Sequence, residues 1–153
     1  MVRMKLSTRS RYGLKAVIDL AVRYGAGPVS LPTLAGEQGV SEGYLEQLLR
    51  ELKKGSVVDT VRGAQGGYEL TCNPAELSVQ RVLTLLEGST AVVDCVSAAD
   101  HACDSACTCS ARPLFLKLQN RINDVLEQTT IQELADDYVE QLKRGGSAKN
   151  ICK

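Results

Sequence analysis

The sequence predicts a mainly α-helical fold with one small β-hairpin. Apolar residues recur at three- and four-residue spacing in several short stretches, which is the pattern of amphipathic helices. A glycine-rich turn lies between two short runs of β-branched and aromatic residues, which indicates a hairpin. A longer apolar stripe follows in the second half of the chain. Together these observations predict a winged helix-turn-helix domain followed by a long dimerisation helix.

The composition is that of a globular protein with an aliphatic core. The chain has 153 residues, of which 44% are hydrophobic, but only 4% are aromatic and none is tryptophan. We find no apolar run of membrane-spanning length and no signal-type apolar segment after the basic N-terminus, so we expect a cytoplasmic protein without a membrane partner. In that compartment six cysteines favour metal, cluster or redox chemistry over structural disulfides.

Charge is distributed unevenly along a chain whose net charge is zero. Residues 1–81 hold 11 Lys and Arg against 8 Asp and Glu, whereas residues 82–153 hold 7 against 10. Any one of these charges can belong to an ordinary solvated surface, but a local basic patch is typical of proteins that bind the DNA backbone. The first 15 residues, with five basic side chains and no acidic one, form such a patch. We assign Arg11 in it as a candidate DNA contact.

Residues 1–88 are expected to form a DNA-binding domain built on three helices. The first is predicted over 8–24, the second over 31–38, and the third from the N-cap Ser41 to a stop at Gly55. The last two form a helix-turn-helix, although this pattern also occurs by chance in helical bundles. The third helix would enter the major groove, where Gln pairs with adenine and Glu with cytosine. Its exposed early residues are candidate DNA contacts: Ser41, Tyr44, Glu46 and Gln47.

The hairpin directly after this helix is expected to act as a wing. Residues 56–61 and 68–71 have the composition of β-strands, and glycines dominate the turn between them. A wing in this place lets an arginine enter the minor groove. The alternative is an ordinary hairpin with a surface arginine. We assign three residues of the turn as candidate DNA contacts: Arg62, Gly63 and Gly66.

Residues 112–142 are expected to hold a long dimerisation helix and a terminal helix, followed by a disordered tail over 143–153. The long helix, over 112–128, carries an apolar stripe. It could pack on its own domain, but that domain is small, and a two-fold interface also fits paired DNA half-sites. We therefore expect a homodimer that binds a double-stranded DNA operator.

Residues 89–111 form a cysteine-rich loop between two predicted helices. The spacing of its cysteines matches neither a zinc ribbon, nor a ferredoxin motif, nor a thioredoxin-type pair. Ordering such a loop costs about 1–2 kcal/mol per residue in backbone entropy, which a bound metal or iron–sulfur cluster would offset. Cys72 and Cys152 are not expected to be ligands. The loop itself holds four cysteines and the only histidine of the chain: Cys95, Cys103, Cys107, Cys109 and His101.

Three stretches carry a specific resemblance to a known family: MKLSTRSRYGLKAVIDLA, SEGYLEQLLRELKKG and VRGAQGGYEL. They resemble the IscR-type iron–sulfur regulators, in the broader Rrf family of winged helix-turn-helix transcription regulators. The resemblance covers about residues 4–138. It implies that Arg62 contacts DNA, that the helix over 112–128 forms the dimer, and that the loop binds an iron–sulfur cluster.

The same resemblance implies a set of cluster ligands, with 2Fe–2S favoured over 4Fe–4S. Arg112 stands where some relatives have a histidine ligand, and a permanently charged arginine cannot bind iron. The fourth ligand is therefore open between Cys107, His101 and an N-terminal residue of the partner subunit. The three implied ligands are Cys95, Cys103 and Cys109.

The leading hypothesis is a DNA-binding repressor of iron–sulfur cluster assembly genes that senses cluster status, with cluster-assembly scaffold proteins as further partners. The same scaffold could instead sense nitric oxide or thiol oxidation, or could bind zinc. An enzyme or an electron carrier fits poorly, because the chain has one histidine, no phosphate-binding loop and no paired acid and base.

Overall fold

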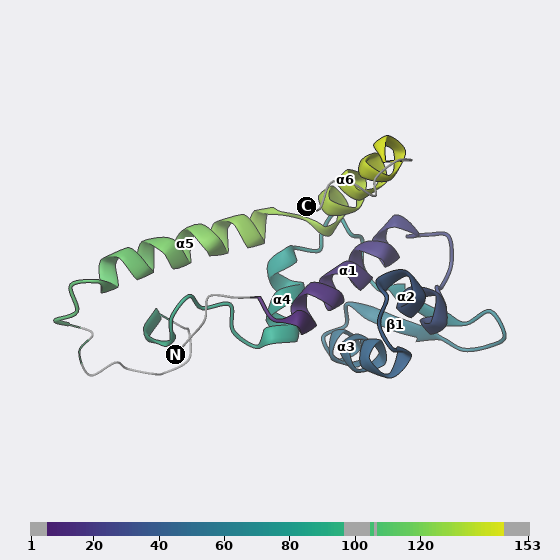
Figure 1. Ribbon diagram of the computed structural model, residues 1–153, viewed down its shortest axis with the longest axis horizontal. Coiled ribbons are helices and arrows are strands. Elements are labelled where there is room, and N and C mark those ends of the chain that lie inside the picture. Colours follow the sequence, from purple (N-terminus) through teal and green to yellow (C-terminus); the bar gives the residue numbers. More distant parts are fainter. Residues whose placement is uncertain (1–5, 97–104, 106, 146–153) are drawn as a thin grey trace.

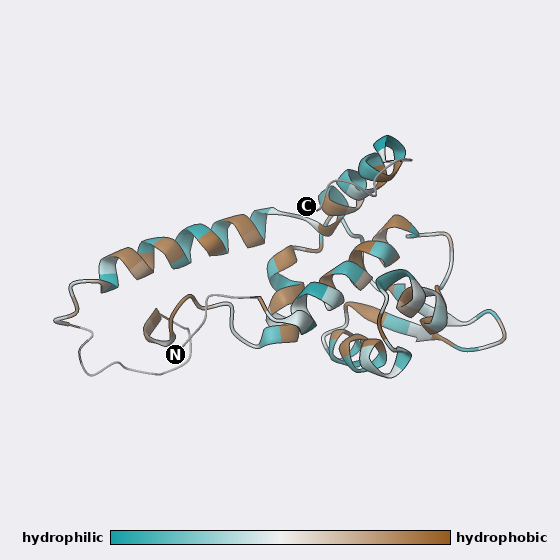
Figure 2. Ribbon diagram, in the orientation of Figure 1, coloured by the Kyte–Doolittle hydropathy of each residue, from teal (hydrophilic) through white to brown (hydrophobic). Residues whose placement is uncertain are grey.

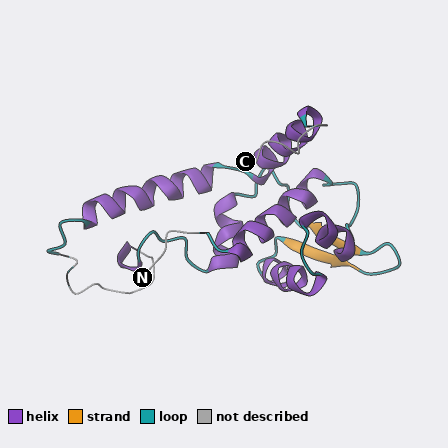
Figure 3. Cartoon of the chain, in the orientation of Figure 1, coloured by secondary structure: helices purple, strands orange, loops and turns teal. Residues whose placement is uncertain are grey.

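The computed structural model describes residues 6–96, 105 and 107–145. Within them the chain is mainly helical, with one two-stranded antiparallel sheet (Figures 1 and 3). The predicted class, a helix-turn-helix with a hairpin wing and a long later helix, is confirmed. In this part of the chain no helix is both long and apolar enough to cross a membrane. The elements are α1 (Thr8–Val22), α2 (Leu31–Gln38), α3 (Glu42–Lys54), β1 (Val58–Val61), β2 (Gly67–Leu70), α4 (Val79–Glu87), the 3₁₀ turn η1 (Asp94–Val96), α5 (Arg112–Gln128) and α6 (Ile131–Arg144).

Hydroxyl side chains mark the starts of five helices. In four of them a serine Oγ accepts a hydrogen bond from the backbone N–H three residues later, which satisfies a donor that the helix start leaves open. Thr130 begins α6 with a capping box, because its side chain and that of Glu133 each accept from the other's backbone N–H. The four capping serines are Ser7, Ser30, Ser41 and Ser78.

Some element ends differ from the predicted ones. Helix α1 ends at Val22, two residues early, and strand β1 begins at Val58. Helix α6 continues to Arg144, so the predicted start of a tail at residue 143 is wrong for the first two tail residues. The Arg144 guanidinium lies 2.9 Å from the Glu140 carboxylate, and basic side chains are favoured in the last turn of a helix. Residues 146–153 lie outside the described part.

An aliphatic core holds helices α1 to α4 and the hairpin together. Each helix contributes fully buried side chains, for example Val17, Leu34, Leu49 and Leu83. The hairpin joins the body through the loop before α2, because Val29 and Tyr68 exchange two backbone hydrogen bonds of 2.9 and 2.8 Å. A Cβ atom on Gly67 would lie 2.2 Å from the Val29 carbonyl oxygen. The close approach of these two backbones therefore requires glycine at position 67.

Helix α6 packs against α1 and is part of the winged domain (Figure 1). Ile131 and Ala135 on its inner face belong to the core. Two backbone hydrogen bonds hold its start, from Ile131 N to Leu77 O at 2.8 Å and from Val79 N to Thr129 O at 2.9 Å. The sequence places α6 after the long helix, but its apolar spacing does not tell which body it packs on.

Helix α5 extends away from the winged domain, and hydrophobic residues recur along its length (Figures 1 and 2). Leu114 is 57% exposed and Val125 is 62% exposed. Leu116 and Leu118 are also exposed. An exposed apolar stripe on one helix of an otherwise well-packed chain marks an interaction surface.

Replacing Ile131 with Ala should lower the free energy of unfolding by about 2–5 kcal/mol, because the side chain is fully buried in the core. Urea denaturation at a single protein concentration measures this change. Leu142→Ala is the matched control, since Leu142 is exposed on the same helix, and it should change the free energy by less than about 0.5 kcal/mol. Equal losses in the two variants would contradict the packing of α6 on α1.

Candidate nucleic-acid interface

The predicted recognition residues lie at the start of α3. Glu46 and Gln47 are exposed, and the Ser41 Oγ accepts the hydrogen bond of the Tyr44 backbone N–H at 3.3 Å. The Glu46 carboxylate lies 3.6 Å from the guanidinium of Arg50, one turn further along the helix. The Gln47 amide therefore faces solvent next to an ion pair, on the surface that a recognition helix presents to the major groove.

Tyr44 lies in a different environment from its polar neighbours. It is half-buried, and its ring meets that of Tyr12 edge-to-face, with centroids 6.2 Å apart and an interplanar angle of 85°. The ammonium of Lys15 lies 5.5 Å from the Tyr12 ring centroid. Aromatic pairs of this geometry stabilise the contact between their helices. Tyr44 therefore positions α3 on α1, a role that the sequence analysis did not predict.

Arg9, and not Arg11, lies beside the recognition helix. Arg9, Gln47 and Arg50 line a hollow of about 310 Å³ between the start of α1 and α3. Arg11 is exposed on α1, and two residues along a helix differ by about 200° in direction, so the two arginines point to different sides. Arg9 was not among the predicted DNA contacts. No sequence signal separates it from Arg11, because both are basic residues of one helix and the side that faces α3 is known only from the packing.

The predicted wing residues lie together in the turn between β1 and β2. Arg62 is exposed there. Gly63 has a φ angle of +124°, which residues other than glycine rarely adopt. A Cβ atom on Gly66 would lie 2.2 Å from the Val61 carbonyl oxygen. The glycines therefore permit the tight turn that carries Arg62.

Lys53 connects the end of α3 to the wing. Its Nζ atom lies 2.9 Å from an Asp59 carboxylate oxygen and donates to the Thr60 hydroxyl at 2.5 Å. The hydrogen bond from Lys53 holds the pKa of Asp59 below its ordinary value. These contacts link the end of the recognition helix to the first strand of the wing, and because all three side chains are exposed they add little to stability.

Three of the four loop cysteines fall in the described part of the chain. Cys95 in η1 and Cys109 before α5 are half-buried, Cys107 is exposed, and all three are free thiols. Cys103 and His101 lie outside the described residues. Among the side chains that the structure describes, no group of three potential metal ligands is close enough to hold an ion.

Arg112 joins the two ends of the cysteine loop. Its backbone N–H donates to the Cys109 carbonyl oxygen at 3.3 Å, and its Nη1 donates to the Cys95 carbonyl oxygen at 3.0 Å. One residue thus brings the backbones of two predicted ligands to the first turn of α5. Arginine cannot serve as the metal ligand that histidine provides in some relatives, but here it positions two cysteines.

Gln119 attaches the segment before Cys95 to the middle of α5. It is only 7% exposed. Its Oε1 accepts from the Val92 backbone N–H at 2.7 Å, and its Nε2 donates to the Thr90 carbonyl oxygen at 3.4 Å and to Asn123 Oδ1 at 2.8 Å. Its burial could not be predicted from the sequence, because a glutamine in an amphipathic helix is usually solvated.

The Rrf2 family model, which describes iron-dependent transcriptional regulators, matches residues 6–137, from the start of α1 into α6. The chain belongs to the Rrf2 family. This Rrf2 chain is 36% identical to the HTH-type transcriptional regulator CymR of Bacillus subtilis over 132 residues, which cover 86% of the chain and 90% of CymR. It is 34% identical to the HTH-type transcriptional regulator IscR of Aliivibrio salmonicida over 140 residues, 91% of the chain and 82% of IscR.

Solved Rrf2-type structures have the same fold. CymR, the global cysteine regulator of B. subtilis, matches with a TM-score of 0.74 and 34% identity over 90% of this chain and 98% of CymR. IscR of T. potens matches with a TM-score of 0.72 and 37% identity over 89% of each chain. The protein is therefore a transcriptional regulator with a DNA-binding helix-turn-helix and not an enzyme. The CymR and IscR relatives have similar sequence identity to this chain. Membership of the Rrf2 family therefore does not identify the signal that this regulator senses.

Replacing Arg62 with Ala should weaken DNA binding by about 5- to 150-fold, because an arginine contact in a groove contributes about 1–3 kcal/mol. Fluorescence anisotropy on a duplex that the unaltered protein selects from a random pool measures the affinity. Arg144→Ala removes an exposed arginine at the end of α6 and is the matched control. Equal affinities of the Arg62 and Arg144 variants would refute the wing assignment.

Proposed function

We propose that this Rrf2-family regulator is a homodimeric repressor of iron–sulfur cluster assembly genes, with an iron–sulfur cluster bound by its cysteine loop as the signal. The contact that carries the proposal is Arg112, which holds the backbones of Cys95 and Cys109 at the start of α5. Their thiols are free and half-buried, the environment in which thiolates can bind iron while bulk water is partly excluded. The IscR relatives support the same assignment.

Cys95, Cys103 and Cys109 would hold the cluster, with 2Fe–2S favoured over 4Fe–4S. The fourth ligand would be Cys107, His101 or an N-terminal residue of the partner subunit. A cluster supplies reversible occupancy and a one-electron couple that respond to iron, sulfide and oxidants. Within the protein, Arg112 orients the backbone at both ends of the loop, and Gln119 fixes the preceding segment to α5. A change in the loop would therefore change how the winged domain sits on α5.

A second copy of the chain would cover the exposed stripe of α5. Leu114 and Val125 are more than half exposed, near opposite ends of the helix. Burial of such side chains stabilises a complex by about 25 cal/mol per Å² of apolar surface. Pairing of two α5 helices would therefore stabilise the dimer relative to separate chains. A two-fold dimer also presents two recognition helices to two half-sites about one helical turn of DNA apart.

Thiol oxidation is the second candidate signal. Cys107 is exposed and lies two residues from the half-buried Cys109, and accessible thiols are the ones that oxidise. The solved structures similar to this chain include an oxidised form of Staphylococcus aureus CymR, at 35% identity. In this alternative the same scaffold would read a change in thiol oxidation state in place of cluster occupancy.

Protein purified without oxygen should be brown and should contain matched amounts of iron and sulfide. Serine substitution of Cys95, Cys103 or Cys109 should remove the visible charge-transfer bands, because each loses a thiolate ligand. Cys72→Ser is the matched control, since Cys72 is half-buried against the core of the winged domain, outside the cysteine loop, and its loss should leave the spectrum unchanged. Protein that stays colourless after reconstitution with iron and sulfide would refute the cluster. Metal analysis and thiol titration of the same sample would then separate zinc binding from thiol sensing.

Replacing Val125 with Glu should weaken dimerisation at least tenfold, because it would put a charge into the apolar stripe of α5. Size-exclusion chromatography with light scattering over a dilution series measures the monomer fraction. Leu142→Glu, on an exposed position of α6, is the control and should leave the dimer intact. Identical dilution curves for the two variants would exclude α5 as the dimer interface.

A further inference from the structure

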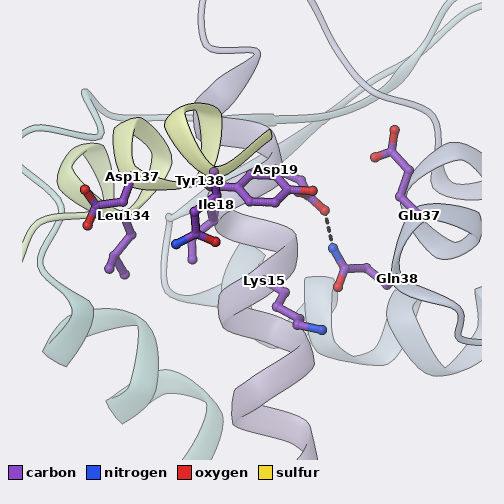
Figure 4. A pocket seen from close by; sticks show the side chains of 9 residues that line it. Lys15, Ile18, Asp19, Glu37, Gln38, Leu134, Asp137 and Tyr138 are labelled. Carbon is purple, nitrogen blue, oxygen red and sulfur yellow. Dashed lines mark hydrogen bonds between the residues drawn. The ribbon is translucent and has the colours of Figure 1, made fainter. Parts of the chain in front are cut away.

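A cavity of about 410 Å³ lies between α1, α2 and α6 (Figure 4). It shares no lining residue with the predicted DNA contacts or the cysteine loop. Figure 4 shows Glu37 and Gln38 on the α2 side and Leu134 and Asp137 on the α6 side. A molecule in this cavity would touch α2, which directly precedes the recognition helix, and α6, which directly follows α5.

Asp19 of α1 is the most deeply buried charged group in the lining. Asp19 is only 7% exposed, and one of its carboxylate oxygens accepts a hydrogen bond from the Gln38 amide. Among the described residues no donor reaches the other oxygen. Burial raises the pKa of this carboxyl group. Lys15 and Arg23 act on this carboxylate electrostatically, but neither donates a hydrogen bond to it, so a cation in the cavity could make a direct contact with its second oxygen.

The rest of the cavity favours a cation over an anion. Three carboxylates line it against a single ammonium, that of Lys15. The Lys15 ammonium is positioned over the ring of Tyr12, at 5.5 Å from its centroid. The Arg23 guanidinium lies 2.5 Å from Glu37 and partly neutralises it. Arg23 and Lys15 also act on Asp19, so Asp19 and Asp137 together keep an excess of negative charge over the one ammonium of the lining.

Apolar and aromatic surface completes the lining. Ile18 and Leu134 provide an aliphatic wall, and Tyr138 adds the ring face to which ammonium groups bind. The volume exceeds that of a water or a metal ion and suits a small organic molecule. We propose that this cavity binds a primary ammonium ion with a short aliphatic chain, whose charged end lies at Asp19 and Asp137 and whose chain lies on Ile18 and Leu134.

The proposal is tested by titrating the full-length protein with isopentylammonium chloride in an isothermal calorimeter. We expect saturable binding, one ion per chain, with a dissociation constant of about 1 mM or tighter. Isopentanol and isovalerate match the probe in shape but lack its positive charge, and neither should saturate. Asp19→Asn and Asp137→Asn should each weaken binding of the ammonium ion about tenfold, since each removes one charge-assisted contact.

Asp136→Asn is the matched control, because Asp136 is exposed on α6 beside the cavity residue Asp137, and its carboxylate accepts from Gln132 at 2.8 Å. This variant should bind isopentylammonium as the unaltered protein does. If the Asp19 variant fails to fold, Asp137→Asn alone decides, because Asp137 is exposed and outside the core. Absence of saturable binding, equal binding of isopentanol, or equal affinities of the Asp136 and Asp137 variants would overturn the proposal.

Discussion

Gln119 is a polar side chain buried on a helix whose apolar stripe is largely exposed, and its hydrogen bonds tie residues 90–92 to α5. Loss of this contact would leave the Val92 N–H without a partner, at a cost of about 1–3 kcal/mol. Arg112 makes a similar attachment at the start of α5. Because hydrogen bonds to backbone atoms form these two attachments, a modest free energy can fasten or release them, as a regulatory contact requires.

The surface that carries the predicted DNA contacts is held differently, by side-chain packing within the winged domain. The Tyr12–Tyr44 contact fixes α3 on α1, and Lys53 fixes the end of α3 to the wing. The buried face of α6 adds a further helix to the same core. Because the helices and the hairpin of the winged domain share one core, the adjustable quantity in the proposed dimer is the relation between each winged domain and its α5. That relation sets the distance between the two recognition helices and hence their fit to paired half-sites.

Local patterns in the sequence predict most of the elements, but they predict few of the contacts between them. Capping serines, the Gly55 stop and the wing glycines act within a few residues, so the bounds of α2 and α3 agree with the predictions. The packing of α6 on α1 could not be predicted, since apolar spacing shows which face turns inward but not what it meets. Gln119 was missed for a related reason: a buried polar side chain can be recognised only once its backbone partners are placed.

Most of the predicted DNA contacts on α3 and the wing are exposed, and Arg9, which was not among the predicted contacts, lies beside α3. Residue type alone does not separate two arginines of one helix, because the direction of each depends on which face packs. The clustering of four cysteines in one loop predicts a ligand-binding segment. The choice among its ligands depends on the path of residues 97–104, which local patterns do not specify.

The most direct test of the proposed coupling between the cysteine loop and the recognition helices is a distance measurement by pulsed electron paramagnetic resonance. Spin labels are placed at Glu42, at the start of α3, in the two subunits of the proposed dimer. The labels are introduced as a non-natural amino acid so that all six cysteines remain. Cluster-loaded protein should give one narrow distance, and cluster-free protein a shifted or broader distribution. Gln119→Ala should give the broad distribution even with the cluster bound. Identical distributions for loaded and cluster-free protein would contradict the coupling between the cysteine loop and the DNA-reading helices.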